Sequence, residues 1–210
     1  MFLDITKFKK FLSTAYKGAG LIVGMLDENL VMTNNARTWG VQVDGDHIPN
    51  KLKAALVELI GDLPEEGEVL NYTKDGAQTE MNLGEFNYYD AWMRARDYAA
   101  YTPFMLKSDY GIYSLLQLHS TMELKPIRRD FLDIISAKDI DHSVEEMPGR
   151  PAYGHETLYW KNDTTIYWAG TFRVDEFTED IVLPRLEFLD CFEQPMKLRI
   201  VEQLPYDEED

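Results

Sequence analysis

Residues 4–33 read DITKFKKFLSTAYKGAGLIVGMLDENLVMT, and they change from a helical to a strand pattern at Gly18. The apolar residues before that glycine recur every three or four positions, as on one face of an α-helix: Ile5, Phe8, Leu12 and Ala15. After it, two apolar runs flank a polar turn at residues 27–29, which is typical of a β-hairpin. The stretch therefore predicts an amphipathic helix that begins near Asp4, followed by two antiparallel strands.

The same helix carries a second, basic stripe. Lys7, Lys10 and Lys17 recur at the helical period on a different face from the apolar residues. Lysines at such positions are ordinarily just the solvated side of a helix. Their context is unusual here, because the whole chain is acidic: it has 21 Lys and Arg against 37 Asp and Glu, and a net charge of −16.

Positive charge is concentrated in three windows with helical spacing, residues 4–17, 50–62 and 125–138. These windows hold ten cations: Lys7, Lys9, Lys10, Lys17, Lys51, Lys53, Lys125, Arg128, Arg129 and Lys138. Since they hold only five acids, their net charge is +5, whereas the remaining residues, with 11 cations and 32 acids, carry −21. An acidic body with basic helices predicts a protein that contacts a polyanion with one surface only.

The first hairpin is followed by an expected strand at residues 38–43 and by a second amphipathic helix, which Pro49 and Asn50 open. The apolar stripe of this helix consists of Leu52, Leu56, Leu59 and Ile60. Residues 68–73 and 77–81 flank a Lys-Asp-Gly turn, which predicts a second hairpin.

The second half of the chain is expected to repeat this order: a helix at 125–138, a hairpin with strands at 157–160 and 164–169, a helix from Pro184, and a strand at 196–201. Pro126 suits the first turn of the helix at 125–138. Leu186, Leu189 and Phe192 are predicted to face inward from the last helix. Residues 82–122 leave the choice between helix and strand open, with a possible helix at 87–101.

Length and composition limit the class of protein. With 210 residues, 45% of them apolar, the chain can form one large domain or two small ones. A single cysteine excludes an internal disulfide framework and favours a reducing compartment. The N-terminus lacks the apolar run of a signal peptide, and no stretch reaches the roughly 20 apolar residues of a membrane helix. We therefore expect a cytoplasmic protein with no membrane partner.

The order of helices and hairpins, with cations on the helices, resembles the DNA sliding clamp family in its two-domain phage and eukaryotic form. The matching stretches are residues 4–33, 48–60, 68–81, 125–135 and 183–201. The resemblance implies an α+β fold of two similar domains, each with two helices packed on an antiparallel sheet. It places an N-terminal domain at residues 1–108, a C-terminal domain at 109–205 and an acidic tail at 206–210.

A clamp subunit is not an enzyme, and the resemblance implies no cofactor and no metal. It implies a processivity factor that encircles duplex DNA without reading its sequence and closes as a homotrimeric ring. A DNA polymerase and a clamp loader are the implied protein partners. The expected DNA-binding residues are Lys7, Lys10, Lys17, Lys51, Lys53, Lys125, Arg128 and Arg129.

Two other function classes remain open. An acidic chain with an acidic tail also fits an interaction protein that imitates the charge of nucleic acid and blocks a host enzyme. The second alternative is a metal-dependent enzyme. Its candidate ligands are Asp139, Asp141, His142, Glu145 and Glu146. Carboxylate oxygens suit hard cations, although the spacing of these residues matches no known metal-binding loop.

Two further groups of side chains have competing interpretations. An aromatic run fits either a base-stacking platform beside Arg94 and Arg96 or a core or subunit interface, and we favour the second: Phe86, Tyr88, Tyr89, Trp92, Tyr98 and Tyr101. Cys191 lies next to Phe192, and we expect a small core residue there rather than a nucleophile.

Overall fold

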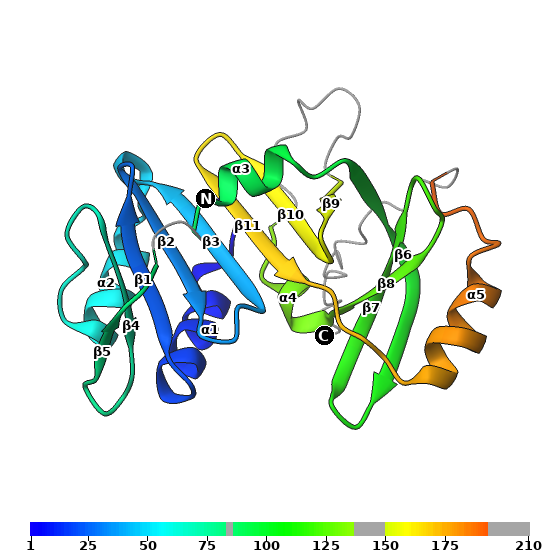
Figure 1. Cartoon of the computed structure of the whole chain (residues 1–210), viewed down its shortest axis with the longest axis horizontal. Helices are drawn as coiled ribbons and strands as arrows, with labels where there is room; N and C mark the ends of the chain where they lie inside the picture. The colour runs from blue at the N-terminus through cyan, green and yellow to red at the C-terminus, as the bar shows by residue number, and fades with distance from the viewer. Residues whose placement is uncertain (83–85, 137–149, 193–210) are drawn as a thin grey trace, which may run out of the picture.

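The computed structural model describes residues 1–82, 86–136 and 150–192, and its strands form one sheet (Figure 1). The sheet has eleven strands in the order β5-β4-β1-β2-β3-β11-β10-β9-β6-β7-β8. Every pair of neighbouring strands is antiparallel. The fold is therefore α+β, with a large antiparallel sheet and few helices.

The elements predicted for the first 81 residues are confirmed. They are α1 (Ile5–Lys17), β1 (Leu21–Leu26), β2 (Asn29–Asn34), β3 (Trp39–Asp44), α2 (Asn50–Ile60), β4 (Glu68–Tyr72) and β5 (Gln78–Glu80). A single turn of 3-10 helix, Gly45–His47, lies between β3 and α2. Strong local signals explain the agreement, because each element has its own apolar period and its own turn residues.

Helix α1 shows how these local signals act. The Asp4 carboxylate caps the helix, since its Oδ1 accepts hydrogen bonds from the backbone N–H groups of Thr6 (2.9 Å) and Lys7 (3.1 Å). The backbone N–H of Gly18 closes the other end on the carbonyls of Thr14 and Ala15. Phe8 is fully buried, and burying a side chain of this size contributes roughly 1.5–3 kcal/mol.

The stretch left open by the sequence contains one short helix and two long strands. Helix α3 covers Tyr88–Met93, and β6 (Asp97–Ser108) and β7 (Gly111–Leu118) form a hairpin. The possible helix at 87–101 is therefore correct only for its first turns. The expected domain boundary after residue 108 coincides with the turn of this hairpin, whose two strands pair, and the division into domains stays a prediction.

The helix expected at 125–138 is wrong over residues 125–128 and again over residues 134–136. Strand β8 (Leu124–Arg128) pairs with β7, and only Arg129–Asp133 form a helix, α4. Pro126 lies within β8 rather than in a first helical turn. An edge strand tolerates a proline because its missing N–H is not needed there, and β8 is the last strand of the sheet.

The last described elements are β9 (Ala152–Gly154), β10 (Thr157–Asn162), β11 (Thr165–Gly170), a π-type turn (Thr178–Val182) and α5 (Leu183–Leu186). The hairpin of β10 and β11 confirms the prediction. The inward orientation of Leu189 is wrong: this side chain is 49% exposed, because the helix ends at Leu186. The strand expected at 196–201 and the tail at 206–210 lie outside the described residues.

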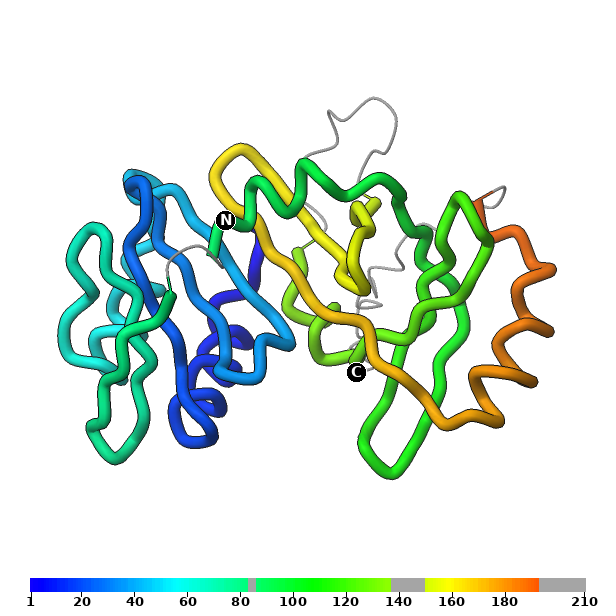
Figure 2. Tube along the Cα trace, viewed as in Figure 1, coloured from blue at the N-terminus to red at the C-terminus, as the bar shows by residue number. Residues whose placement is uncertain are grey.

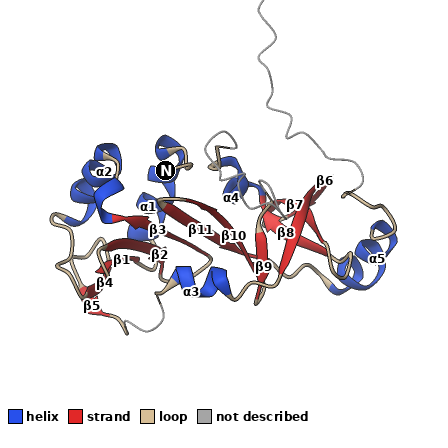
Figure 3. Cartoon of the chain, turned by 90° about the horizontal axis from the view of Figure 1, so that it is seen from above, coloured by secondary structure: helices blue, strands red, loops and turns tan. Residues whose placement is uncertain are grey.

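Helices cover both faces of the sheet. Helices α1, α2 and α4 lie on one face, and α3 lies on the other (Figure 3). The main core forms under α1, α2 and α4 and includes Leu21 and Val23 of β1 together with Phe8 of α1. Ile22 points to the opposite face, where it packs with Tyr88 of α3. The period of two along β1 thus gives each sheet face an apolar layer.

The two halves of the chain meet in the middle of the sheet. Strand β11 pairs with β3, in a register that joins Thr165 to Val43 and Ala169 to Trp39, so that late strands lie beside early ones (Figure 2). The described helices differ between the halves: α1 and α2 have 13 and 11 residues, whereas α4 and α5 have five and four. The expectation of two similar domains, each with two packed helices, is therefore not confirmed.

Candidate nucleic-acid interface

The lysines of α1 are exposed along its solvent side. Phe8 and Leu12 face the sheet, and the helical period turns Lys9, Lys10 and Lys17 away from it. None of these three lysines forms an ion pair with a carboxylate in the described parts of the chain. Their charges are therefore available to an anion in solution.

Helix α2 adds two more exposed lysines beside α1. Leu52 and Leu56 are fully buried in the core that α1 shares, and Lys51 and Lys53 are exposed. As on α1, no ion pair to either lysine is formed within residues 1–82, 86–136 and 150–192. The five exposed lysines Lys9, Lys10, Lys17, Lys51 and Lys53 on these two helices are called the lysine face below; on α2, Lys51 and Lys53 leave the helix on either side of the buried Leu52.

Lys7 has a structural contact of its own. Its Nζ donates a hydrogen bond to the backbone carbonyl of Asp133, 2.9 Å away, at the C-terminal end of α4. A cation beside the last carbonyls of a helix is favourable. Lys7 therefore links α1 to α4, in addition to any contact with a ligand.

The predicted cations of the second half are neutralised by neighbours. Arg128 forms two hydrogen bonds with Asp130, from Nε (3.0 Å) and Nη2 (2.6 Å). Arg129 Nε donates to Asp133 Oδ1 at 2.9 Å, four residues further along. Both guanidinium groups thus have carboxylate partners that compete with phosphate, unlike the lysine face.

Lys125 is held within a polar cluster. Its Nζ lies 3.3 Å from Glu123 Oε2 and 3.6 Å from Glu156 Oε1, and its side chain is only 21% exposed. Burial lowers the pKa of Lys125, but Tyr153, Glu156 and Glu123 outweigh this effect, so that its pKa is raised. Burial, together with the hydrogen bond to Glu156, raises the pKa of Tyr153 to about 12. The predicted DNA contact of Lys125 would require breaking these pairs.

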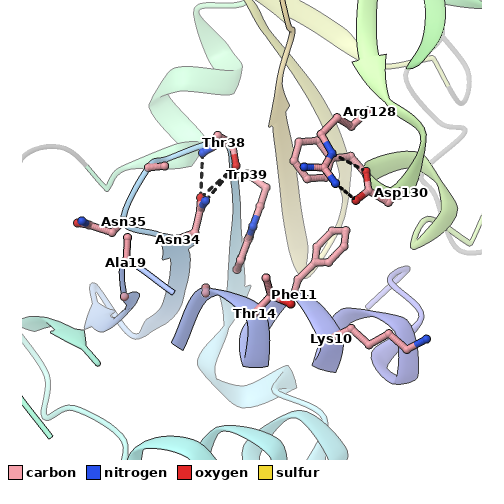
Figure 4. Close-up of a pocket in the computed structure, with 14 residues that line it drawn as sticks. Lys10, Phe11, Thr14, Ala19, Asn34, Asn35, Thr38, Trp39, Arg128 and Asp130 are labelled. Carbon is pink, nitrogen blue, oxygen red and sulfur yellow. Dashed lines mark hydrogen bonds and ion pairs between the residues drawn. The ribbon is translucent and has the colours of Figure 1, made fainter. Parts of the chain in front are cut away.

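A cavity of about 450 Å³ lies between α1, the β2–β3 turn and α4 (Figure 4). Its apolar walls are formed by Phe11, Trp39 and Phe131. The centroid of the Phe11 ring lies 5.9 Å from that of Trp39 and 5.6 Å from that of Phe131. Its lip includes Lys10 and the Arg128–Asp130 pair. The cavity therefore combines aromatic walls with cations at the entrance, in the size range of ligand pockets.

The aromatic run belongs mainly to the interior, as favoured. Phe86 and Tyr88 are buried in the core beneath α3, and the Tyr101 hydroxyl accepts a hydrogen bond from Trp160 Nε1 at 2.7 Å. Tyr89 is 47% exposed and packs against Trp92, which lies under Lys161. Since the buried rings are not accessible to bases, the run does not form a continuous stacking platform.

Exposed carboxylates gather where β1–β4 meet their turns: Asp27, Glu28, Asp46, Glu65, Glu66 and Glu68. The backbone holds them together, because the N–H of Glu28 donates to Glu66 Oε1 and the N–H of Gly45 donates to the carbonyl of Glu28. This arrangement gathers several carboxylates on neighbouring turns of the first four strands.

The remaining predictions have mixed outcomes. Within the described residues, no group of three or more His, Cys, Asp or Glu side chains is placed to hold a metal ion. The acids at 139–146 and Lys138 lie outside that part of the chain. Cys191 is buried, and burial raises the pKa of its thiol, which is the opposite of what a nucleophile needs. Among the described helices, none is long and apolar enough to cross a membrane.

Sequence reasoning missed the carboxylate partners. The spacing of Arg129 and Asp133, four residues apart in a predicted helix, is the signal that could have indicated their pairing. No such signal joins Lys125 to Glu156, because Lys125 lies in β8 and Glu156 lies in the turn between β9 and β10, and only the folding of the chain brings them together. The cavity was also missed, since its walls come from three separate segments.

Comparisons with known proteins give little further information. No family model matches the chain, and no curated protein matches it. Among solved structures it is similar to the DNA polymerase III beta subunit of Thermotoga maritima, with 10% identity and a TM-score of 0.31. The match covers 84% of this chain and 65% of that one, so the chain spans less than two thirds of its length. A similarity this low does not support a functional assignment.

Proposed function

We propose that this chain is a clamp-like processivity factor that contacts duplex DNA through the lysine face. One observation supports the proposal above all others. Five exposed lysines without carboxylate partners in the described chain lie on two adjacent helices, in a protein whose net charge is −16. Such segregation favours a polyanion at this face and repels it from the rest of the surface.

The proposed contact reads charge rather than sequence. Lysine side chains are flexible point charges that neutralise phosphates and release counterions, so binding depends strongly on salt. Without base contacts, the protein can move along the duplex. The lysine face consists of lysines alone and contains no arginine guanidinium that would bind a phosphate in a fixed geometry. This composition suits a mobile contact.

The ring, the polymerase and the clamp loader belong to the same proposal. A ring requires two different surfaces that join copies head to tail. Exposed apolar side chains gather on the segment at 177–189, including Phe177 (66% exposed) and Phe188 (86%). The edge strand β5 is exposed at the other end of the strand order. We propose that these ends meet in a homotrimer.

The decisive test is charge reversal on the lysine face. Lys10, Lys17 and Lys53 are changed together to Glu, and Lys7 is kept because it also holds α4. We expect this variant to lose DNA binding at 150 mM salt. If binding is still measurable at low salt, the slope of log K against log [salt], where K is the DNA association constant, should fall in magnitude by about 3, one for each lost phosphate contact. Fluorescence anisotropy with a labelled duplex measures both.

The matched control changes the same total charge elsewhere. Arg96, Lys107 and Lys161 are outside the lysine face, and their triple change to Glu leaves it intact. DNA binding should fall much less than in the first variant. Equal loss in the two variants would show that only net charge matters, and unchanged binding in the first would refute the assigned face.

A second candidate function rests on the carboxylates gathered at the turns of the first four strands. The carboxylates of Asp27, Glu28, Glu65 and Glu66 lie on neighbouring turns, and an array of this kind can imitate phosphates. In that case the chain would be an acidic inhibitor that binds a basic protein and ignores DNA. The same anisotropy experiment separates the candidates, because an inhibitor would show no DNA binding before any lysine is changed.

A further inference from the structure

The cavity beside α1 has the features of a site for an aromatic or aliphatic side chain. Phe11 projects from α1 between Trp39 and Phe131, with ring centroids 5.9 Å and 5.6 Å from theirs (Figure 4). Asn34 and Thr38 form the polar end and are already hydrogen-bonded to each other. An occupant therefore gains apolar contact here but meets few unpaired polar groups in the wall.

The entrance favours an occupant that carries negative charge. Lys10 and Thr14 line the cavity from α1, and Lys17 continues the same helical stripe beside the lining residue Ala19. On the opposite lip, Arg128 is paired with Asp130, so the positive charge at the entrance comes from Lys10. An apolar anchor followed by acids would fill the cavity and lie along this stripe.

The chain itself contains a segment of this chemistry. Residues 202–210 read EQLPYDEED, in which Leu204 and Tyr206 precede four consecutive acids. Thirteen residues separate Tyr206 from the last described residue, Phe192, and at about 3.3 Å per residue they can span roughly 40 Å. This reach is comparable with the dimensions of a domain of this size.

We propose that the cavity binds the side chain of Tyr206 from the same chain, with Asp207–Asp210 placed against Lys10 and Lys17. Single exposed ion pairs are weak, and several of them tethered to an apolar anchor act together. A tether within one chain also gives an effective concentration in the millimolar range, so even a weak contact is occupied. The docked tail covers part of the lysine face and competes with polyanions there.

Disulfide trapping in the full-length chain tests the contact directly and needs no DNA. The variant carries Thr14→Cys and Asp207→Cys, which keeps the Tyr206 anchor, with Cys191→Ser to remove the native thiol. In a second variant Asn35→Cys, on the opposite wall, replaces Thr14→Cys. The control pairs Asp207→Cys with Tyr110→Cys, since Tyr110 is 87% exposed and lies outside the cavity. Non-reducing electrophoresis and mass spectrometry follow bond formation under mild oxidation.

We expect both cavity pairs to close within one chain at least about tenfold faster than the control pair, because docking raises the local concentration of the two thiols. This advantage should shrink in about 0.5 M salt, which screens the exposed charges. Equal rates for the cavity and control pairs would overturn the proposal. So would bonds that form only between two chains, which would assign the site to a second copy.

A second measurement covers the case in which the cysteine variants fold poorly. The tail of the full chain is disabled by Tyr206→Ser together with D207N, E208Q, E209Q and D210N, so that it does not compete, and a labelled peptide of residues 202–210 is the probe. Saturable binding that weakens about tenfold with Lys10→Glu supports the site, and no binding overturns it. Because neither readout contains DNA, failure here leaves the proposed function standing, and failure of DNA binding leaves this site standing.

Discussion

At the residue scale, the hydrogen bond between Trp160 and Tyr101 is a sensitive point of the core. Trp160 is 1% exposed, and its Nε1 donates to the Tyr101 hydroxyl at 2.7 Å. Tyr101→Phe leaves this buried donor unpaired, so we expect a loss of about 1–3 kcal/mol in the free energy of unfolding. Urea denaturation measures it. An unchanged value would mean that water reaches the indole nitrogen.

Glu156 predicts a pH dependence at the same scale. Burial raises its pKa, but hydrogen bonds from Tyr153 and Thr171 and the charge of Lys125 outweigh this effect, so its pKa is lowered. The ionised form therefore stabilises the fold at pH values above its unfolded pKa, and the contribution is lost as pH falls through the lowered folded pKa.

Glu156→Gln removes this titration. We expect the variant to be less stable than the unmodified protein at pH 7 and the difference to shrink between about pH 5 and pH 3. Thermal unfolding across that range provides the measurement, with Glu58→Gln, an exposed acid on α2, as control. A constant difference at all pH values would contradict the assigned ion pair.

At the element scale, α1 depends on its N-cap. Asp4→Ala removes the acceptor of the two backbone N–H groups at the start of the helix, and we expect a loss of about 1 kcal/mol, within a range of 0.5–2. Lys9, Lys10 and Lys17 of the lysine face lie on α1. We therefore expect DNA affinity to fall only if the loss of the cap unwinds the N-terminal turn of this helix. Chemical denaturation with Asp62→Ala as the exposed control checks the first effect.

Agreement between sequence and structure also differs by element. Helix α1 and the β1–β2 hairpin were predicted within a residue or two, because capping residues, turns and apolar period agree over residues 4–33. The helix at 125–138 failed because Ile127 and Phe131 fit a helical period, while pairing with β7 decides the state of residues 124–128. Long-range pairing overrides a local pattern of this kind.

At the scale of the whole molecule, ring formation predicts a particle of three chains of 24.4 kDa. Phe188→Asp places a charge in the proposed contact and should yield monomers without loss of stability, since the side chain is already 86% exposed. Tyr110→Asp, at an equally exposed position in the turn between β6 and β7, should leave the trimer intact. Sedimentation velocity distinguishes these states, and an unmodified protein that is monomeric at 50 µM would contradict the ring.

The candidate site illustrates what each level of description can predict. The lysine face follows from the period of α1 and α2, because exposure on a helix is set by position relative to the buried stripe. The same reasoning misjudged Lys125, Arg128 and Arg129. Whether these three cations can bind a phosphate depends on their carboxylate partners Glu156, Asp130 and Asp133. Counting charges along the sequence does not identify those partners.

By itself, the sequence determined the elements of the first 81 residues, the acidic balance of the chain and the positions of the lysines on α1 and α2. Only the tertiary structure decided that β11 lies beside β3, that β8 is a strand, and that Phe11, Trp39 and Phe131 enclose a cavity. The physical reason is the range of the interactions. Caps, turns and periodicity act over a few residues, whereas the pairing of β11 with β3 joins residues more than a hundred positions apart and the Lys125–Glu156 ion pair joins residues 31 positions apart.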